Sequence, residues 1–184
     1  MRIISGRYKG RRIDPQVSLA VRPTTDFAKE GLFNVLSNLV DFTETSVLDL
    51  FSGTGNISFE FISRGCTHVV ALDIERRCVD FINHTATKLG MDGLKAVRVN
   101  VLVYLRNPYQ TFDLIFADPP YQMSGIDQLP NQILNAGMLN EGGLLILEHS
   151  EKYNFTEYPL FTQVRQYGKV HFSFFRQTSV GKAD

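Results

Sequence analysis

Short apolar runs alternate with amphipathic stretches from Val47 onward, and this alternation restricts the fold more than any other feature of the sequence. It is the pattern expected when parallel strands are joined by helical crossovers. The apolar runs that we predict to be strands are residues 46–50, 68–73, 96–100, 112–117 and 144–148. Helices are expected between them at residues 56–64, 75–89 and 125–136. The sequence therefore predicts a doubly wound α/β fold with a mostly parallel sheet.

The C-terminal part of the chain departs from this alternation. Residues 162–167 and 170–176 are strand-like runs joined by a short turn at Gly168, which permits a hairpin. We therefore expect an antiparallel pair to finish the sheet. A length of 184 residues with 43% hydrophobic content suits one globular domain with a small appendage. We divide the chain into residues 1–40, an N-terminal extension, and residues 41–184, the α/β domain.

The N-terminal extension has two predicted parts. Residues 1–13 alternate basic and apolar side chains around two glycines, which predicts a small hairpin or an extended arm. Apolar residues on one face predict a helix over residues 27–39, with Thr24 or Thr25 as its N-cap. The extension is expected to pack on the core and to offer its basic side to a partner.

Charge is distributed unevenly along a chain whose net charge is zero. Residues 1–30 hold seven Lys and Arg against three Asp and Glu, residues 31–164 hold eight against fifteen, and residues 165–184 hold four against one. Clustered positive charge binds phosphate whatever the overall sum, so both basic ends are candidates for contact with a nucleic acid. Solvated surface charge is the alternative explanation.

Several classes of protein are disfavoured by the composition. No apolar run approaches the roughly 18 residues of a membrane span, and the charged N-terminus is not followed by the apolar stretch of a signal peptide. Cys66 and Cys78 have neither a zinc-like spacing nor the density of a disulfide scaffold. We expect a cytoplasmic monomer without a metal site or a membrane contact, in which both cysteines are ordinary, partly buried residues.

A glycine-rich turn follows the first predicted strand and precedes a helix. In an open α/β sheet, ligands bind at the carboxyl ends of the strands, where glycine allows close approach to the backbone. A dinucleotide fingerprint would need a third glycine at position 58, which is Ser58. Asp49 would also repel a pyrophosphate, whereas it can attract the amino group of S-adenosylmethionine. The turn therefore favours S-adenosylmethionine as the cofactor.

Two further strand ends carry polar residues suited to a nucleoside. Asp73 can accept hydrogen bonds from both ribose hydroxyls, and the amide oxygen of Asn100 can accept one from the adenine amine, unless Asn100 is a simple turn residue. The cofactor-binding residues that we predict are Asp49, Phe51, Ser52, Gly53, Gly55, Asp73, Ile74, Asn100, Val101 and Asp118.

Asp118-Pro119-Pro120-Tyr121 follows the predicted strand at residues 112–117. The prolines hold a stiff extended turn and leave the Pro119 carbonyl free to accept a hydrogen bond. An exocyclic amine on a nucleobase is a poor nucleophile, because its lone pair is delocalised into the ring. Hydrogen bonds from the amine to Asp118 and to the Pro119 carbonyl would aim that lone pair at a methyl donor, while Tyr121 stacks on the base. We predict Asp118, Pro119 and Tyr121 as the catalytic residues.

The sequence resembles a known family over nearly its whole length. The segments that carry the resemblance are Met1-Arg2-Ile3-Ile4-Ser5-Gly6, Gly10-Arg11-Arg12, Arg22-Pro23-Thr24-Thr25, Glu30, Phe33-Asn34-Val35-Leu36, the Asp49 to Gly55 turn, Phe112-Asp113, Asp118 to Tyr121, Leu147-Glu148, Tyr167-Gly168 and Phe174-Phe175. These segments resemble the bacterial small-subunit ribosomal RNA guanine-N2 methyltransferases of the RsmD type. The N-terminal segments are specific to that family, whereas the glycine turn and the Asp-Pro-Pro-Tyr motif also occur in other amino-methyltransferases.

The resemblance implies a Rossmann-like class I methyltransferase fold that uses S-adenosylmethionine. It also implies methylation of one guanine at N2 in the 16S rRNA of an assembled or partly assembled small subunit. The residues expected to contact RNA are Arg2, Arg7, Lys9, Arg11, Arg12, Arg22, Thr24 and Lys29. Two positions depart from the family: Lys29 stands where Arg is usual and loses the bidentate fork, and Asn100 stands where Asp is common.

Two other functions compete with this hypothesis. A DNA adenine-N6 methyltransferase would use the same Asp-Pro-Pro-Tyr geometry, but such enzymes usually carry a sizeable target-recognition segment for which this chain has no room. A ribosome assembly factor could keep the fold without turnover, although the intact Asp49, Asp118 and Tyr121 argue against that role.

Overall fold

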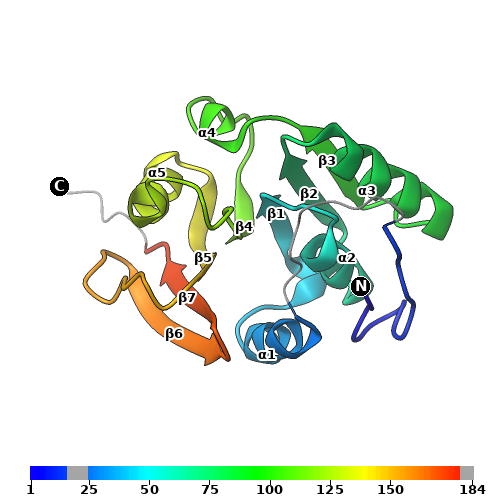
Figure 1. Cartoon of the computed structure of the whole chain (residues 1–184), viewed down its shortest axis with the longest axis horizontal. Helices are drawn as coiled ribbons and strands as arrows, with labels where there is room; N and C mark the ends of the chain where they lie inside the picture. The colour runs from blue at the N-terminus through cyan, green and yellow to red at the C-terminus, as the bar shows by residue number, and fades with distance from the viewer. Residues whose placement is uncertain (16–24, 179–184) are drawn as a thin grey trace.

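A computed structural model of the chain describes residues 1–15 and 25–178, and its centre is a seven-stranded sheet with the order β3-β2-β1-β4-β5-β7-β6 (Figure 1). The strands are β1 Ser46–Leu50, β2 His68–Asp73, β3 Leu94–Arg98, β4 Phe112–Ala117, β5 Leu139–His149, β6 Phe161–Tyr167 and β7 Val170–Arg176. Strands β3, β2, β1, β4 and β5 pair in parallel, whereas β7 pairs antiparallel with both β5 and β6. The predicted mostly parallel sheet that ends in an antiparallel hairpin is confirmed.

Helices cover both faces of this sheet. They are α1 Asp26–Leu36, α2 Asn56–Ser63, α3 Arg76–Leu89, α4 Val101–Tyr104 and α5 Leu129–Asn135, with short 3-10 turns at η1 Phe42–Glu44 and η2 Ile126–Gln128. Along β4, Leu114 and Phe116 pack into a core with α1, α2 and α3, while Ile115 and Ala117 pack into a second core with α4 and α5. The side-chain alternation of a strand therefore feeds two hydrophobic layers, which explains why the strand sequences are apolar throughout.

The N-terminal arm, residues 1–13, folds back on itself as a small hairpin. An antiparallel bridge joins Arg2 to Arg12, and the Met1 amino group donates to the carbonyl of Ile13 at 3.0 Å. Ile3 and Ile13 are buried in the same core as α1 and the sheet. The arm thus packs on the α/β core, and the boundary at residue 40 stays a prediction about roles.

Several element boundaries differ from the sequence-based expectation. The third strand lies two residues earlier than residues 96–100, because β3 pairs with β2 in the register that sets Leu94 opposite Val69. The helix expected over residues 125–136 is divided into η2 and α5, and Pro130 occupies the first turn of α5, where a missing N–H is tolerated.

The predicted N-terminal helix is also shorter than expected. It spans Asp26–Leu36, and the Thr25 hydroxyl accepts a hydrogen bond from the backbone N–H of Ala28 at 3.2 Å. Thr25 is therefore the cap, while Thr24, the other candidate, lies outside the described residues.

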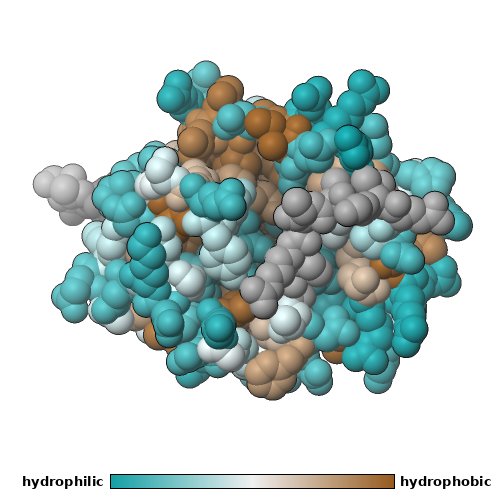
Figure 2. All heavy atoms as spheres, in the orientation of Figure 1, coloured by the Kyte–Doolittle hydropathy of each residue, from teal (hydrophilic) through white to brown (hydrophobic). Residues whose placement is uncertain are grey.

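The two cysteines are buried and unreactive. Cys66 and Cys78 are free and buried, and burial raises the pKa of each thiol to about 12, so neither is an activated nucleophile. Among the described residues, the structure contains no helix that is both long and apolar enough to cross a membrane. Figure 2 shows an apolar patch over α4, where Leu102 and Val103 are exposed.

Candidate active site

The glycine-rich turn after β1 is tied to the end of β2. The backbone N–H of Ser52 donates to the carbonyl of Leu72 at 2.9 Å, and the N–H of Gly53 donates to Oδ2 of Asp73 at 2.8 Å. The turn therefore lies at the carboxyl edge of the sheet, at the position where open α/β folds bind ligands.

Backbone conformation explains the residue types in this turn. Gly53 and Gly55 have φ angles of 53° and 80°, and a Cβ atom on Gly55 would lie 2.9 Å from Cγ1 of Ile82. Phe51 also has a positive φ of 61°, which costs about 1–3 kcal/mol for a residue other than glycine. Strain of this kind persists only where surrounding contacts hold the chain, here the bonds to Leu72 and Asp73.

Asp49 lies buried beneath the turn, with its side chain only 1% exposed. The hydroxyl of Ser58 donates a hydrogen bond to its carboxylate. Burial raises the pKa of Asp49 to about 7, the Ser58 hydrogen bond opposes that rise, and the nearby charge of Asp73 adds to it. A cation bound next to Asp49 would stabilise the ionised form. Ser58 thus serves the site in a way that sequence reasoning missed, having read it only as the absence of a third glycine.

Asp73 holds the backbone of the cofactor turn and that of the residue before α3. Its Oδ1 accepts from the N–H of Glu75 at 2.8 Å, and its Oδ2 accepts from Gly53. Burial raises the pKa of this carboxyl group. Each oxygen of a carboxylate has a second lone pair, so Asp73 keeps acceptor capacity for the predicted hydrogen bonds from ribose hydroxyls.

Asn100 has a different role from the one predicted for its amide oxygen. That oxygen caps α4, where it accepts from the N–H of Leu102 at 2.9 Å and from the N–H of Val103 at 3.4 Å. The alternative explanation of Asn100 as a turn residue is thus favoured, because its oxygen already holds two donors. Of the other predicted cofactor contacts, Val101 is buried in the first turn of α4 and Ile74 is 61% exposed.

The turn also contains a polar atom that lacks a partner. In the described part of the chain, the buried Oγ of Ser52 makes no hydrogen bond. A buried hydroxyl of this kind is destabilising unless a ligand or water satisfies it. Together with the carboxylates of Asp49 and Asp73, it forms a donor and acceptor set that fits a nucleoside with an amino-acid tail.

The Asp-Pro-Pro-Tyr turn lies next to this turn because β1 and β4 are neighbours. The N–H of Asp118 donates to the carbonyl of Leu50 at 3.4 Å, and the carbonyl of Pro120 accepts from the N–H of Met123 at 2.8 Å. Among the described residues, no backbone hydrogen bond ends on the Pro119 carbonyl. Tyr121 is 54% exposed at the rim. The structure thus brings the predicted reaction residues together with the predicted cofactor turn.

Three carboxyl groups meet at this point. Ala117 pairs with Leu147 across β4 and β5, so the next residues, Asp118 and Glu148, are neighbours at the carboxyl edge. Burial raises the pKa of Asp118 well above its usual range, and the charges of Glu148 and Asp49 raise it further. Glu148 is 4% exposed and was not among the predicted site residues, although its position at a strand end could have identified it.

The N-terminal arm is fixed to α2 through a buried glutamate. Oε2 of Glu60 accepts from the N–H of Ile4 at 2.8 Å, and Oε1 accepts from the N–H of Ser5 at 3.0 Å. A Cβ atom on Gly6 would lie 1.7 Å from the carbonyl oxygen of Ser63, so only glycine allows this close approach. The arm is therefore a docked hairpin.

Most of the predicted RNA contacts are accessible on this hairpin. Those that the structure exposes are Arg2, Arg7, Lys9, Arg11 and Arg12. Arg2 forms an ion pair with Asp26 at 3.4 Å, and both side chains are about half exposed, so this pair contributes little stability. Arg22 and Thr24 lie outside the described residues.

Lys29 was predicted to contact RNA, and the structure shows that this prediction is wrong. Its side chain is 1% exposed, and its Nζ donates to the carbonyl of Arg2 at 2.7 Å and to Oδ1 of Asn56 at 2.8 Å. It also lies 3.6 Å from Oε2 of Glu60. Lys29 therefore joins α1, the arm and α2 inside the protein, and it is not available to a phosphate.

Comparison with known proteins matches residues 1–176 to the family model described as Conserved hypothetical protein 95. The chain belongs to this family, whose members include proteins named ribosomal RNA small subunit methyltransferase D. The Escherichia coli K12 protein of that name is 24% identical over all of this chain and 93% of its own length. The protein of that name from Buchnera aphidicola subsp. Baizongia pistaciae is 28% identical over 95% of this chain and 91% of its own length.

Solved structures agree with the fold of this RsmD-type chain. A hypothetical protein from Thermus thermophilus superimposes with a TM-score of 0.82 at 25% identity, covering 95% of this chain and 98% of its own. The T. thermophilus 16S rRNA N2 G1207 methyltransferase RsmC, in complex with AdoMet and guanosine, gives a TM-score of 0.67 at 19% identity, covering 84% of this chain and 44% of its own. The second comparison shows a shared fold alone.

Proposed function

We propose that this protein transfers a methyl group from S-adenosylmethionine to the exocyclic N2 of a guanine in 16S rRNA. The observation that carries the proposal is the contact between Asp118 and the end of β1, which brings the Asp-Pro-Pro-Tyr turn beside the cofactor turn. Relatives named ribosomal RNA small subunit methyltransferase D support the substrate class. RsmC, which was solved with AdoMet and guanosine, shares the fold, and the choice of cofactor and base rests on the site residues of this chain.

The cofactor turn has a complementary group for each part of S-adenosylmethionine. The buried carboxylate of Asp49 would attract the methionyl ammonium group, and Asp73 would hold the ribose hydroxyls. The unpaired hydroxyl of Ser52 would donate to a polar atom of the ligand. When bound, the cofactor supplies an electrophilic methyl group on a sulfonium.

Asp118 and Pro119 would orient the guanine amine. The two N–H groups of the amine would donate to a carboxyl oxygen of Asp118 and to the Pro119 carbonyl, which would direct the nitrogen lone pair toward the methyl group. Alignment of two reactants lowers a barrier by about 7–11 kcal/mol, whereas one hydrogen bond to a charged group adds only about 1.5–3 kcal/mol. Positioning of the amine therefore contributes more to lowering the barrier than the hydrogen bond itself. Transfer would form an N–C bond as the S–C bond of the sulfonium breaks, and the proton of the methylated amine would pass to ionised Asp118 or to water.

Tyr121 would hold the target base at the rim of the site. It is half exposed and follows the rigid proline pair, which supports a role for its ring in receiving an extruded base. Stacking of a base on an aromatic ring contributes about 1–3 kcal/mol, which offsets part of the free energy needed to unstack that base.

The substrate is proposed to be rRNA within an assembled or partly assembled small subunit, recognised by one copy of the protein. The exposed arginines of the docked arm would contact phosphates and position the protein on the RNA. This role needs no base-specific contact from the arm, which agrees with its simple basic composition.

Methyl transfer from labelled S-adenosylmethionine tests this function. Small subunits that lack the modification should accept label, and Asp118→Ala should abolish transfer while cofactor binding persists. Asp92→Ala, a matched change at an exposed position, should leave transfer unchanged. Equal labelling of duplex DNA would contradict the rRNA substrate, and tight subunit binding without label would indicate an assembly factor.

A further inference from the structure

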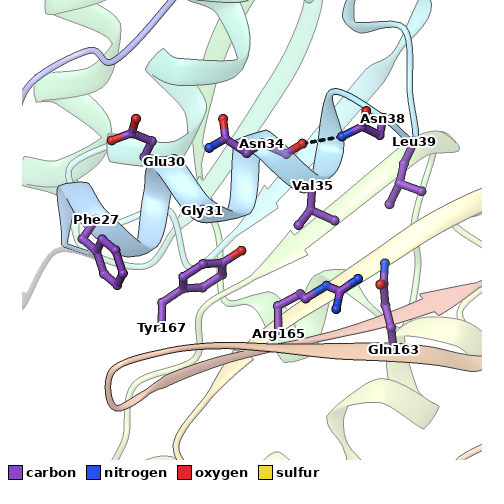
Figure 3. Close-up of a pocket in the computed structure, with 10 residues that line it drawn as sticks. All are labelled: Phe27, Glu30, Gly31, Asn34, Val35, Asn38, Leu39, Gln163, Arg165 and Tyr167. Carbon is purple, nitrogen blue, oxygen red and sulfur yellow. Dashed lines mark hydrogen bonds between the residues drawn. The ribbon is translucent and has the colours of Figure 1, made fainter.

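A groove of about 650 Å³ runs between α1 and the edge strand β6, outside the site described above. Figure 3 shows Tyr167, Arg165 and Gln163 on β6 opposite side chains of α1. These β6 residues alternate along the strand and therefore share the face that points to the helix. None of them was predicted to bind a ligand.

The groove opens at the same edge of the sheet as the reaction site. Strands β5 and β6 both run antiparallel to β7, so Tyr167 at the end of β6 lies at the carboxyl edge together with Glu148. Three strand spacings separate β6 from β4, which corresponds to roughly 14 Å between the end of the groove and Asp118. A strand of RNA whose target base enters the site can reach the groove within a few nucleotides.

Aromatic rings form the end of the groove that is nearest to this edge. Phe27 is 67% exposed, and its ring lies edge-on to Tyr167 with centroids 5.8 Å apart. Tyr167 lies against the backbone of Gly31, where an added Cβ atom would come within 2.1 Å of the tyrosine ring. Glycine is unfavourable inside a helix, so its presence in the middle of α1 has a specific use: it admits the Tyr167 ring.

Polar side chains line the rest of the groove. Arg165 and Glu30 face it from opposite walls, and no ion pair among the described residues includes either of them. The amides of Asn34 and Gln163 add hydrogen-bonding groups between them. An unpaired guanidinium suits a phosphate, while amide and carboxylate groups suit the edges of bases.

We propose that this groove binds a single-stranded segment of the RNA substrate next to the target guanine. The inference rests on the proposed function, because it takes RNA as the substrate. Aromatic rings that stack on bases, an arginine for the backbone and amides for base edges are the combination by which proteins hold unpaired RNA. Bases in a duplex are already stacked and would not reach these rings. The groove would thus bind the RNA strand that leaves the reaction site. The arm would contact RNA on the other side of α1.

Fluorescence tests the groove directly, because the chain contains no tryptophan. Phe27→Trp places a single indole at the aromatic end of the groove. Tyr109→Trp places one at a position that is 69% exposed and precedes β4, on the side of the sheet where the parallel strands begin. A short oligouridylate should quench the first indole saturably and the second weakly. The same oligouridylate paired with oligoadenylate should quench neither. Equal quenching of both indoles, or equal quenching by the duplex, would overturn the proposal.

A charge change then tests the role of Arg165. In the Phe27→Trp background, Arg165→Ala should weaken oligouridylate binding about tenfold, as expected for a lost charge-assisted contact. Lys95→Ala on β3, at the other edge of the sheet, is the matched control and should change binding little. If Arg165→Ala weakens subunit binding but not oligouridylate binding, the groove binds a protein segment and the proposal fails. If wild type and Arg165→Ala methylate small subunits equally well, the groove does not bind the substrate RNA. The proposed function would still stand in that case.

Discussion

Ser58 donates a hydrogen bond from its hydroxyl to the buried carboxylate of Asp49. The two residues lie on either side of the glycine turn, so this bond links the end of β1 to the first turn of α2. It offsets only part of the effect of burial, because the pKa of Asp49 is still raised to about 7. Asp49 is thus held in an environment that favours the neutral acid until a cation arrives.

The stability of the ligand-free protein should fall as pH rises from about 4 to about 7. Asp49 has a folded pKa of about 7, above its unfolded value near 4, so its contribution is fully present below pH 4 and is lost as pH rises through 7. Asp49→Asn removes this ionisation and should raise the melting temperature at pH 8 by at least about 2–4 °C, corresponding to about 1 kcal/mol or more. Thermal melts of both proteins at pH 5 and pH 8 measure the effect. A melting temperature that falls equally at both values would contradict it.

Cofactor binding should show the opposite dependence on pH. Binding of the cationic ligand favours ionised Asp49, so affinity should increase from pH 5 to about pH 7 and then level off. Titration calorimetry in buffers of different ionisation enthalpy should also detect proton release near pH 6. Asp49→Asn should bind more weakly at pH 8 and lose this dependence. A pH dependence that survives in Asp49→Asn would assign it to another group.

Lys29 should matter for folding and not for RNA affinity. Burial lowers its pKa, an effect that the charge of Glu60 opposes. Lys29→Met leaves Glu60 with Arg64 at 2.9 Å but removes a buried cation, so the free energy of unfolding should drop by up to about 3–5 kcal/mol. Chemical denaturation measures this drop. Unchanged stability together with weaker subunit binding would restore Lys29 to the RNA surface.

The docked arm should contribute to subunit binding through its charge alone. Neutralising Arg11 and Arg12 together, as Arg11→Gln with Arg12→Gln, should weaken subunit binding and reduce its logarithmic salt slope by about 1.5. Lys95→Gln changes an exposed cation on β3 that points to the face of the sheet opposite to the arm, and it should leave the slope unchanged. Binding measured between 50 and 200 mM salt, the range over which this effect is large, decides the question. An unaltered slope in the double variant would remove the arm from the RNA site.

Local sequence patterns predicted the strands that decide the site. The apolar runs at residues 46–50, 68–73 and 112–117 have the bounds that the structure shows for β1, β2 and β4. Their ends are marked by Asp49, Asp73 and Asp118, whose meeting at one edge follows from parallel pairing. Such features are visible in sequence because apolar content and turn residues are local.

Features that depend on residues far apart in the chain could not be predicted from the sequence. Lys29 follows a threonine cap and looks like a surface cation, yet it is buried by Asn56 and Glu60, which are far from it in sequence. The strand at 96–100 was displaced by two residues because pairing with β2, not composition, sets its register. Helix α4 has only four residues, too few for a helical period to appear.

The identity of the methylated base tests the central claim most directly. After transfer to small subunits that lack the modification, the 16S rRNA is digested to nucleosides and fragments, and the added methyl group is located by mass spectrometry. We predict one N2-methylguanosine with the wild-type protein and none with Asp118→Ala. A methyl group on adenine N6, on a ring nitrogen or on the ribose would contradict the proposed geometry of amine, Asp118 and Pro119.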